Sequence, residues 1–579
     1  MNPDSQELRQ AVASLAPFFK RAFWFSLAAS LLVLVPSAYM LEVYDRVVSS
    51  RSFLTLLMLT IVVLGAYVVM EVLEWARAGL LHGAGAALDA KLGDRVFDGI
   101  FAARLRQFPL GAQAANDLRT VRDFLASPVV MAAMESPASL VFLACIFAIS
   151  PILGCAALVG AVIQVFIGWL NERSTQPPLA AANRSSIAAQ LYADSTLRNA
   201  QVIEAMGMIK DVHRRWLDKQ REFLRLQAIA SERAGGYQSA MKFLQLVMNS
   251  GLLGLGAWLL INRDLNGGAG MMIVGSILGG RVLAPLVQIV SNWRSLVTVR
   301  EAWTRLDRML SLVPPKPETM PLPEPYGRLD VEHVVATAPG GSVPILRNVA
   351  FGLMPGEVLV VVGPSASGKT TLARLLMGLW PAASGKVRLD GADVFTWNKS
   401  ELGPHVGYLP QGVELFDGTL AENIARFGEV EPAKVEAAAK AVGLHELIMA
   451  LPDGYDSPVG RDGAMLSGGQ RQRVGLARAI YGDPSFVVLD EPNSSLDEEG
   501  DAALASTITE LKSRGTTFVV MTHRTSILAV ADKMLVLRDG QVQAFGPRDE
   551  VMAALTKAVA QGNQGQQQRG APAPRIAVA

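Results

Sequence analysis

The stretch GPSASGKTT, Gly363–Thr371, fits the pattern G-x-x-x-x-G-K-[ST] through Gly363, Gly368, Lys369 and Thr370. An apolar run, EVLVVV, precedes it, and a helical pattern, TLARLLMGLW, follows it. In such a loop, glycines let backbone N–H groups curl around phosphate oxygens, the lysine reaches the β- and γ-phosphates, and the threonine hydroxyl ligates Mg²⁺. The following helix adds the positive end of its dipole. The stretch therefore predicts a strand, a phosphate-binding loop and a helix. This context makes a chance glycine-rich loop a weak alternative.

The residues around this loop have the pattern of an α/β domain. Short β-branched runs alternate with helical stretches between residues 329 and 555, and four of the runs are EVLVVVG, SFVVLDEP, TTFVVMTH and KMLVLRDG. Strands of a parallel sheet are uniformly apolar because helices cover both faces of the sheet. We predict one α/β domain at 329–555 with a largely parallel core sheet.

The first part of the chain, residues 1–310, contains the long uncharged runs. A hydrocarbon core needs about 20 residues of helix, and runs near that length predict six membrane spans at about 23–43, 53–71, 129–149, 151–171, 241–262 and 271–293. Over the whole chain, 50% of the residues are hydrophobic and 18% are charged, a balance too apolar for an ordinary soluble enzyme. The alternative is buried helices of a soluble protein, and the recurrence of runs of spanning length argues against it.

Lysine and arginine are concentrated before span 1, between spans 2 and 3, and between spans 4 and 5. Positive residues favour cytoplasmic loops. We therefore expect both termini and two long helical loops to face the cytoplasm, with helices that extend past the bilayer.

Two further segments have a biased composition. The proline-rich SLVPPKPETMPLPEP, Ser311–Pro325, predicts a linker at 311–328. Residues 556–579 are rich in glutamine, glycine and proline and predict a disordered tail, because they offer little apolar surface to bury. The formal net charge of +1 gives no global basic field that would indicate a nucleic-acid partner.

Four more stretches complete a catalytic pattern. FVVLDEP, Phe486–Pro492, is an apolar strand whose final Asp490 can hold the Mg²⁺ shell, and the adjacent Glu491 can polarise a water for attack on the γ-phosphate. LSGGQ, Leu466–Gln470, opens a predicted helix and would offer a serine and glycine amides to an anion. YLPQ places Gln411 after a short strand, and THR places His523 at the end of another.

In order and spacing, these motifs resemble the nucleotide-binding domain of an ABC transporter, and the six-span part resembles the exporter-type transmembrane domain. The resemblance implies ATP and Mg²⁺ as ligands, with Glu491 as the catalytic base and His523 as the switch histidine. It implies that the metal is held by Thr370, Gln411 and Asp490. The residues that would bind the nucleotide are Gly363, Pro364, Ser365, Ala366, Ser367, Gly368, Lys369, Thr370, Thr371 and Gln411, and, from a second copy of the chain, Ser467, Gly468, Gly469 and Gln470.

The resemblance also implies a half-transporter that acts as a homodimer, because one span set and one nucleotide domain are present. The segments expected to carry motion between the two are around AANDLRTVRDF and DSTLRNAQVIEAMGM. Two positions depart from the family pattern. Ala366 stands where the family often has glycine, and Ala338 stands where the family has an aromatic that stacks on adenine.

Within the exporters, PSAYMLEVYDRVVSSRS (Pro36–Ser52) and GRVLAPLVQIV (Gly280–Val290) resemble segments of bacterial type I secretion permease/ATPases. This resemblance implies export of a protein substrate across the inner membrane, with the nucleotide-binding domain in the cytoplasm. It further implies a periplasmic membrane-fusion adaptor and an outer-membrane channel as partners, contact with membrane lipid, and no nucleic-acid partner.

Several alternatives stay open at this point. An exporter of lipids or hydrophobic small molecules would have the same fold. A catalytically inactive ABC protein that serves as a scaffold is a third reading, and Lys369, Asp490, Glu491 and His523 argue against it.

Arg281 leaves a second question open, because it lies inside span 6, where a charge faces a cavity or a partner. It either lines the substrate path or pairs with a carboxylate such as Glu135 or Glu42.

Overall fold

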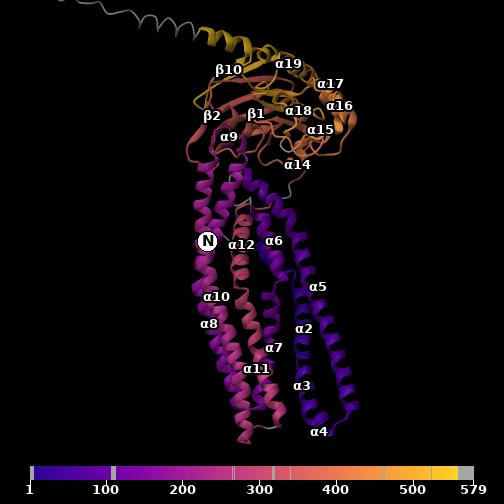
Figure 1. The fold of residues 1–579 in the computed structure, drawn as a ribbon. Coiled ribbons are helices and arrows are strands. Elements are labelled where there is room, and N and C mark those ends of the chain that lie inside the picture. Colours follow the sequence, from indigo (N-terminus) through magenta and orange to yellow (C-terminus); the bar gives the residue numbers. More distant parts are fainter. Residues whose placement is uncertain are drawn as a thin grey trace, which may run out of the picture. The chain divides into compact units, whose positions relative to one another are not determined.

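The computed structural model describes residues 6–105, 113–263, 265, 268–315, 320–339, 341–460, 463–522 and 524–557. These residues form two compact units, which are described separately: a helical unit that ends at Pro315 and an α/β unit that follows it (Figure 1). The division falls inside the predicted linker. Residues 316–319 of that linker, the predicted switch histidine His523, and residues 558–579 of the predicted tail lie outside the described residues.

Among its described residues the helical unit has six helical stretches that are long and apolar enough to cross a membrane, and the predicted spans overlap them, three of the six running one or two residues past the end of the stretch. The helices of this unit are α1 Gln6–Ala13, α2 Ala16–Leu32, α3 Leu34–Glu42, α4 Val48–Ser50, α5 Phe53–Leu105, α6 Ala114–Leu125, α7 Pro128–Ile149, α8 Pro151–Leu197, α9 Ala200–Ala205, α10 Ile209–Ile261, α11 Gly268–Ser291 and α12 Trp293–Leu312.

Three of these helices are much longer than a bilayer requires. Helices α5 and α10 each have 53 residues, and α8 has 47. At about 1.5 Å per residue they measure roughly 70–80 Å, against a hydrocarbon core of about 30 Å. Helices α8 and α10 pack along each other over much of this length (Figure 1). The helices therefore continue past the apolar windows, as the sequence predicted.

The first predicted span is not one helix in the structure. Helix α2 ends at Leu32 and α3 begins at Leu34, because the ring of Pro36 clashes with the carbonyl four residues earlier and cannot donate a backbone hydrogen bond. A π-helical turn, Val43–Val47, follows α3. An exposed ion pair of 3.4 Å joins Glu42 and Arg46 across this turn.

A buried cation joins three helices inside the unit. Arg77 of α5 is 6% exposed and donates to the Ser26 hydroxyl of α2 at 3.0 Å and to Glu135 Oε1 of α7 at 2.6 Å. Of the two readings left open for Arg281, pairing with Glu135 or Glu42 is therefore wrong, since each of these carboxylates pairs with a different arginine. Arg281 itself lies exposed on α11 and makes no ion pair with any described residue.

An apolar core of this unit lies where α1, α5, α6 and α12 meet. Leu8, Leu88, Leu118 and Leu306 are among its buried members. Asp117 of α6, itself buried, accepts two hydrogen bonds from Arg305 of α12, at 2.6 and 3.0 Å. The segment AANDLRTVRDF is therefore a helix held against α12 by a bidentate, charge-assisted contact.

The α/β unit contains two sheets. A six-stranded sheet has the order β10-β9-β3-β8-β7-β6, in which only β10 runs antiparallel to its neighbour, and an antiparallel sheet has the order β2-β1-β4-β5. The strands are β1 Leu329–Thr337, β2 Pro344–Leu353, β3 Val358–Val362, β4 Ser384–Leu389, β5 Ala392–Asp393, β6 Val406–Leu409, β7 Phe486–Asp490, β8 Thr517–Met521, β9 Lys533–Arg538 and β10 Gln541–Pro547.

Helices cover the parallel strands. They are α13 Lys369–Leu376, α14 Lys399–Leu402, α15 Leu420–Ile424, α16 Pro432–Ala441, α17 His445–Met449, α18 Gly468–Ile480, α19 Glu498–Ser513 and α20 Thr525–Val530, with 3₁₀ turns at Gly403–His405 and Gly454–Asp456. Successive residues of β3 point into two different apolar cores: Val358 and Val360 into one, Leu359 and Val361 into the other. Burial on both faces is why the runs are continuously apolar, and it confirms the predicted parallel core.

The Arg77 contact gives a first prediction. Replacing Arg77 with Met leaves Glu135, whose side chain is 34% exposed, without its partner in apolar surroundings. Removing one member of a fully buried pair costs about 3–5 kcal/mol, and partial exposure reduces this to about 1–3 kcal/mol. The apparent Tm of the detergent-solubilised protein should fall by several degrees. Arg46→Met is the control, because its pair is exposed, and equal shifts in the two variants would contradict the argument.

Candidate nucleotide site

The phosphate loop connects the end of β3 to the start of α13. Lys369, the first residue of α13, is buried, and its Nζ donates to the carbonyls of Gly363 at 2.7 Å and Pro364 at 3.2 Å. Gly368 has φ of +105°, and a Cβ there would lie 2.6 Å from the Leu346 side chain. A Cβ on Gly363 would lie 2.1 Å from the Leu537 carbonyl. Both glycines are therefore required by the backbone path, independently of any ligand.

The remaining loop residues differ in exposure. Pro364, Ser365 and Ala366 are exposed, Thr370 is half-buried, and Ser367 and Thr371 are buried. Within the described part of the chain the Ser367 hydroxyl has no hydrogen-bond partner. Ala366 has φ of +64°, in the left-handed region that disfavours residues with a side chain. This backbone conformation thus explains why glycine is common at this position in the family.

Asp490 ends β7 beside this loop. It is 1% exposed, and neither of its carboxylate oxygens makes a hydrogen bond of good geometry within the described residues. Burial raises the pKa of the Asp490 carboxyl, the Thr370 hydroxyl opposes this, and the Glu491 carboxylate adds to it. A buried carboxylate with free lone pairs fits a hard divalent cation, which takes oxygen ligands. The donor set at this position is therefore suited to Mg²⁺.

Glu491 follows in an unusual backbone conformation, with φ of +54°. Its N–H donates to the Met521 carbonyl of β8 at 2.9 Å, which holds the residue at the end of the sheet. Gln411, from the segment after β6, donates from Nε2 to Glu491 Oε2 at 3.1 Å. Two side chains that the sequence placed 80 residues apart thus contact each other directly.

Both chain neighbours of the predicted switch histidine, Thr522 and Arg524, are described. Thr522 is buried, and its hydroxyl donates to Asn493 Oδ1 at 3.0 Å, while the N–H of Arg524 donates to the Thr522 hydroxyl at 3.1 Å. Asn493 also donates to Asp501 Oδ1 at 2.6 Å. The backbone on either side of His523 is therefore tied to the segment that follows Glu491.

The LSGGQ motif begins α18. Ser467 is the N-cap residue: its hydroxyl accepts from the Gln470 N–H at 3.2 Å, and the Gln470 side chain accepts from the Ser467 N–H at 2.9 Å. This capping box uses the N–H groups of Ser467 and Gln470 and leaves the amides of Gly468 and Gly469 at a helix N-terminus.

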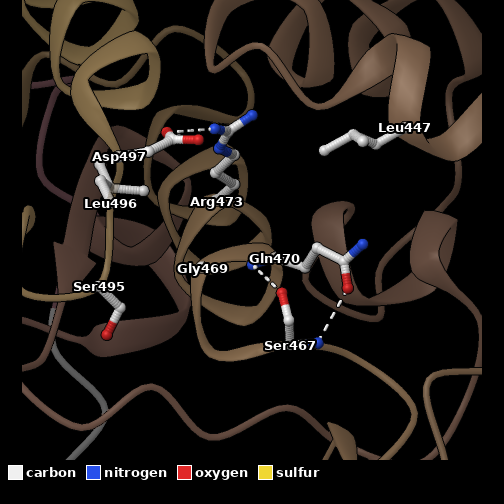
Figure 2. Close-up of a pocket in the computed structure, with 8 residues that line it drawn as sticks. All are labelled: Leu447, Ser467, Gly469, Gln470, Arg473, Ser495, Leu496 and Asp497. Atoms are coloured by element: carbon white, nitrogen blue, oxygen red, sulfur yellow. Dashed lines mark hydrogen bonds and ion pairs between the residues drawn. The ribbon is translucent and has the colours of Figure 1, made fainter.

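A pocket of about 330 Å³ opens at this motif, and Figure 2 shows its lining residues, which come from three segments. They are Leu447, Ser467, Gly469, Gln470, Arg473, Ser495, Leu496 and Asp497. None of these described lining residues belongs to the phosphate loop. Within one chain, therefore, the structure brings Gln411 and Glu491 into contact but gathers the signature residues in a separate pocket.

Sequence reasoning missed the residues that join these two places. Gln472 and Arg473, directly after the motif, contact the segment that follows Asp490. Their positions in the predicted helix after the motif were the available signal that they have a structural role. The spacing of the motifs did not reveal that their partners lie in the segment after Asp490. Ala338 occupies the position at which the family usually has an aromatic residue. It lies half-buried just after β1, and its carbonyl accepts from the Gly341 N–H at 2.9 Å.

Comparison with known proteins agrees with this geometry. A family described as "ABC transporter" matches residues 346–494, and one described as "ABC transporter transmembrane region" matches residues 22–278. A type I secretion system ATP-binding protein, PrsD of Rhizobium meliloti, is 40% identical over 92% of this chain and 92% of its own length. The toxin RTX-I translocation ATP-binding protein of Actinobacillus pleuropneumoniae is 28% identical over 94% of this chain and 77% of its own.

A solved bacterial Atm1-family ABC exporter with ATP bound has a TM-score of 0.78 and 21% identity, covering 94% of this chain and 97% of its own, which speaks for the fold. Six apolar helices joined to an ATPase unit make the protein a multi-pass membrane ATP hydrolase. The chain belongs to the ABC transporters, in the branch of the type I secretion ATP-binding proteins.

Proposed function

We propose that this protein is the ABC component of a type I secretion system and uses ATP to export a protein substrate across the inner membrane. The observation that carries the proposal is one chain holding both the six apolar helices and the ATPase motifs, similar over 92% of its length to a type I secretion ATP-binding protein. The named relatives that translocate toxins favour a protein cargo over lipids or hydrophobic small molecules.

Roles in hydrolysis follow from the geometry of the site. The loop amides from Gly363 to Thr371 and the Lys369 ammonium would hold the triphosphate. Thr370, Gln411 and Asp490 would hold Mg²⁺, which would neutralise charge on the β- and γ-phosphate oxygens. Glu491 would accept a proton from the attacking water, and Gln411 orients its carboxylate in the present arrangement. His523 would complete the site as the switch residue.

The signature pocket supports a homodimer. Ser467, Gly469 and Gln470 line a pocket to which no described residue of their own phosphate loop contributes, so these three residues and the adjacent Gly468 would serve ATP held by a second copy. An N-terminus of a 13-residue helix with its side-chain groups already capped offers free backbone amides to phosphate. Binding of ATP would then close the dimer, and hydrolysis would release it.

The remaining assignments follow from the type I secretion relatives. We place the helical unit in the bacterial inner membrane, in contact with lipid, and the ATPase unit in the cytoplasm. A periplasmic adaptor and an outer-membrane channel are the expected partners, and the net charge of +1 gives no reason to expect nucleic acid.

Arg281 is assigned to the substrate path. It is exposed on α11, and both carboxylates considered as partners are paired elsewhere. A lone guanidinium facing lipid is costly, whereas one that faces a hydrated path is not.

Replacing Glu491 with Gln tests the catalytic assignment. We expect hydrolysis to fall about 10²–10⁴-fold, because the general base is lost. ATP binding should persist, because the amide keeps the side-chain shape, and the variant should accumulate as an ATP-bound dimer in size-exclusion chromatography. Hydrolysis at the wild-type rate would show that Glu491 is not the base.

Ala366 tests the conformation of the phosphate loop. Valine is β-branched and is rarely found at positive φ, so Ala366→Val should distort the loop and raise the KM for ATP about tenfold or more. Ala366→Gly removes the conformational strain and should stay within about threefold of the wild type. Steady-state ATPase measurements on both variants decide the matter, and an unaffected valine variant would contradict the assigned loop geometry.

The cargo class is tested by comparing the secreted proteins of a deletion strain with those of its parent. Loss of one or a few extracellular proteins, restored by the wild-type gene but not by Glu491→Gln, supports protein export. An unchanged set of secreted proteins, under conditions in which the gene is expressed, would instead favour the lipid or small-molecule alternative.

The same strain tests Arg281. Complementation with Arg281→Gln should lower secretion several-fold while purified protein keeps its ATPase activity, because the change lies far from the phosphate loop in the chain. Arg263→Gln is the matched control, since Arg263 is an exposed arginine just after α10. Normal secretion by the Arg281 variant would remove this residue from the substrate path.

A further inference from the structure

Gln472 is a buried amide on the helix that carries the signature motif. It is 4% exposed and lies one turn into α18. Its Nε2 group faces the carbonyls of Glu491 at 3.1 Å and Pro492 at 2.5 Å, and its Oε1 accepts from the Ser495 N–H at 2.8 Å. One side chain therefore holds both ends of the backbone between the proposed base and the residues that line the signature pocket.

The backbone that Gln472 holds is not in a relaxed conformation. Glu491 has φ of +54°, in the left-handed region that is unfavourable for a residue with a Cβ. On one side this backbone is fixed by the Met521 carbonyl of β8, and on the other by the Gln472 amide. Loss of either contact would let the Glu491 carboxylate leave the position in which Gln411 now contacts it.

The next residue makes a second link of the same kind. Arg473 donates to Asp497 Oδ1 at 2.6 Å and to the Gly443 carbonyl at 3.0 Å. Asp497 is the N-cap of α19, and the Gly500 N–H and the Arg473 guanidinium hold the pKa of its carboxyl below the usual value. The segment from Glu491 to Asp497 is therefore attached to α18 at both of its ends, so movement of α18 must move this segment.

We propose that Gln472 is a positioning residue that couples the two ATP sites of the dimer. The inference rests on the proposed homodimer, in which the signature of one chain serves ATP held by the other. When α18 closes on the partner's triphosphate, Gln472 carries that displacement to the Glu491 backbone of its own chain. Occupancy of one site thereby sets the position of the base at the other, and hydrolysis becomes cooperative in ATP.

Two substitutions of similar volume test the amide. Gln472→Met removes the hydrogen bonds, and Gln472→Glu keeps an acceptor for Ser495 but sets a carboxylate against two carbonyl oxygens. In the full-length protein we expect kcat to fall about tenfold for Met and further for Glu. The KM for ATP should change less than about threefold, and the Hill coefficient should fall towards one, because the phosphate loop is intact but the coupling is lost.

A structural control separates positioning from general destabilisation. Thr507 of α19 is buried, and its hydroxyl donates to the carbonyls of Ala441 and Ala503, away from the segment that Gln472 holds. Thr507→Val should lower the apparent Tm of the ATPase unit yet keep kcat and the Hill coefficient of the wild type. If Thr507→Val lost cooperativity to the same degree as Gln472→Met, the coupling role would be overturned.

Mixed dimers locate the effect. In a dimer in which one chain carries Glu491→Gln, both sites still bind ATP, and hydrolysis uses the base of the intact chain. Gln472→Met should reduce the rate about tenfold when it is placed in that intact chain and less than about twofold in the other. The inference would be overturned by equal effects in both placements. It would also be overturned if the homodimer of Gln472→Met kept the kcat and Hill coefficient of the wild type, provided that Glu491→Gln still abolished hydrolysis. Unchanged hydrolysis in Glu491→Gln would instead overturn the proposed catalytic site itself.

Discussion

Parallel pairing of β3, β8, β7 and β6 is the constraint on which the ATPase unit depends. Backbone hydrogen bonds between these strands bring their carboxyl ends to one edge of the sheet. The phosphate loop leaves β3, Asp490 ends β7, and Gln411 follows β6 at that edge. Residues scattered over more than 120 positions of the sequence converge because of this pairing, as ligand sites of open α/β sheets generally do. The meeting of these residues at one site is thus a consequence of the parallel direction of the strands.

In the helical unit the corresponding constraint is the absence of water from the hydrocarbon core. A chain that crosses it must satisfy its own backbone groups, and continuous helices do this. Buried charge in the unit is paired for a related reason, as Arg77 is with Ser26 and Glu135. Past the apolar windows, the helices instead use apolar packing and charge-assisted contacts such as Asp117 with Arg305.

The sequence predicted those parts of the fold that have a strong local signal. Continuous apolar runs marked the parallel strands, and uncharged runs of spanning length marked the six helices. It did not predict the antiparallel sheet, because β1 and β2 are only partly buried and their register contains bulges. The sequence left open whether Arg281 pairs with a carboxylate such as Glu135, because the choice among cations depends on helix packing, and Glu135 pairs with Arg77. In the candidate site, motif residues were found by their spacing, whereas Gln472 acts through backbone atoms of a distant segment that no spacing reveals.

The unbroken length of α10 has a mechanical consequence. It runs for 53 residues as one helix without an internal proline, and it spans roughly 80 Å. Rotating such a helix by about 5° around its midpoint displaces each tip by roughly 3–4 Å in opposite directions, comparable to the shifts of packed elements in known switching proteins. A long continuous helix of this kind thereby converts a small rotation at one end into a displacement of several ångströms in the opposite direction at the other end.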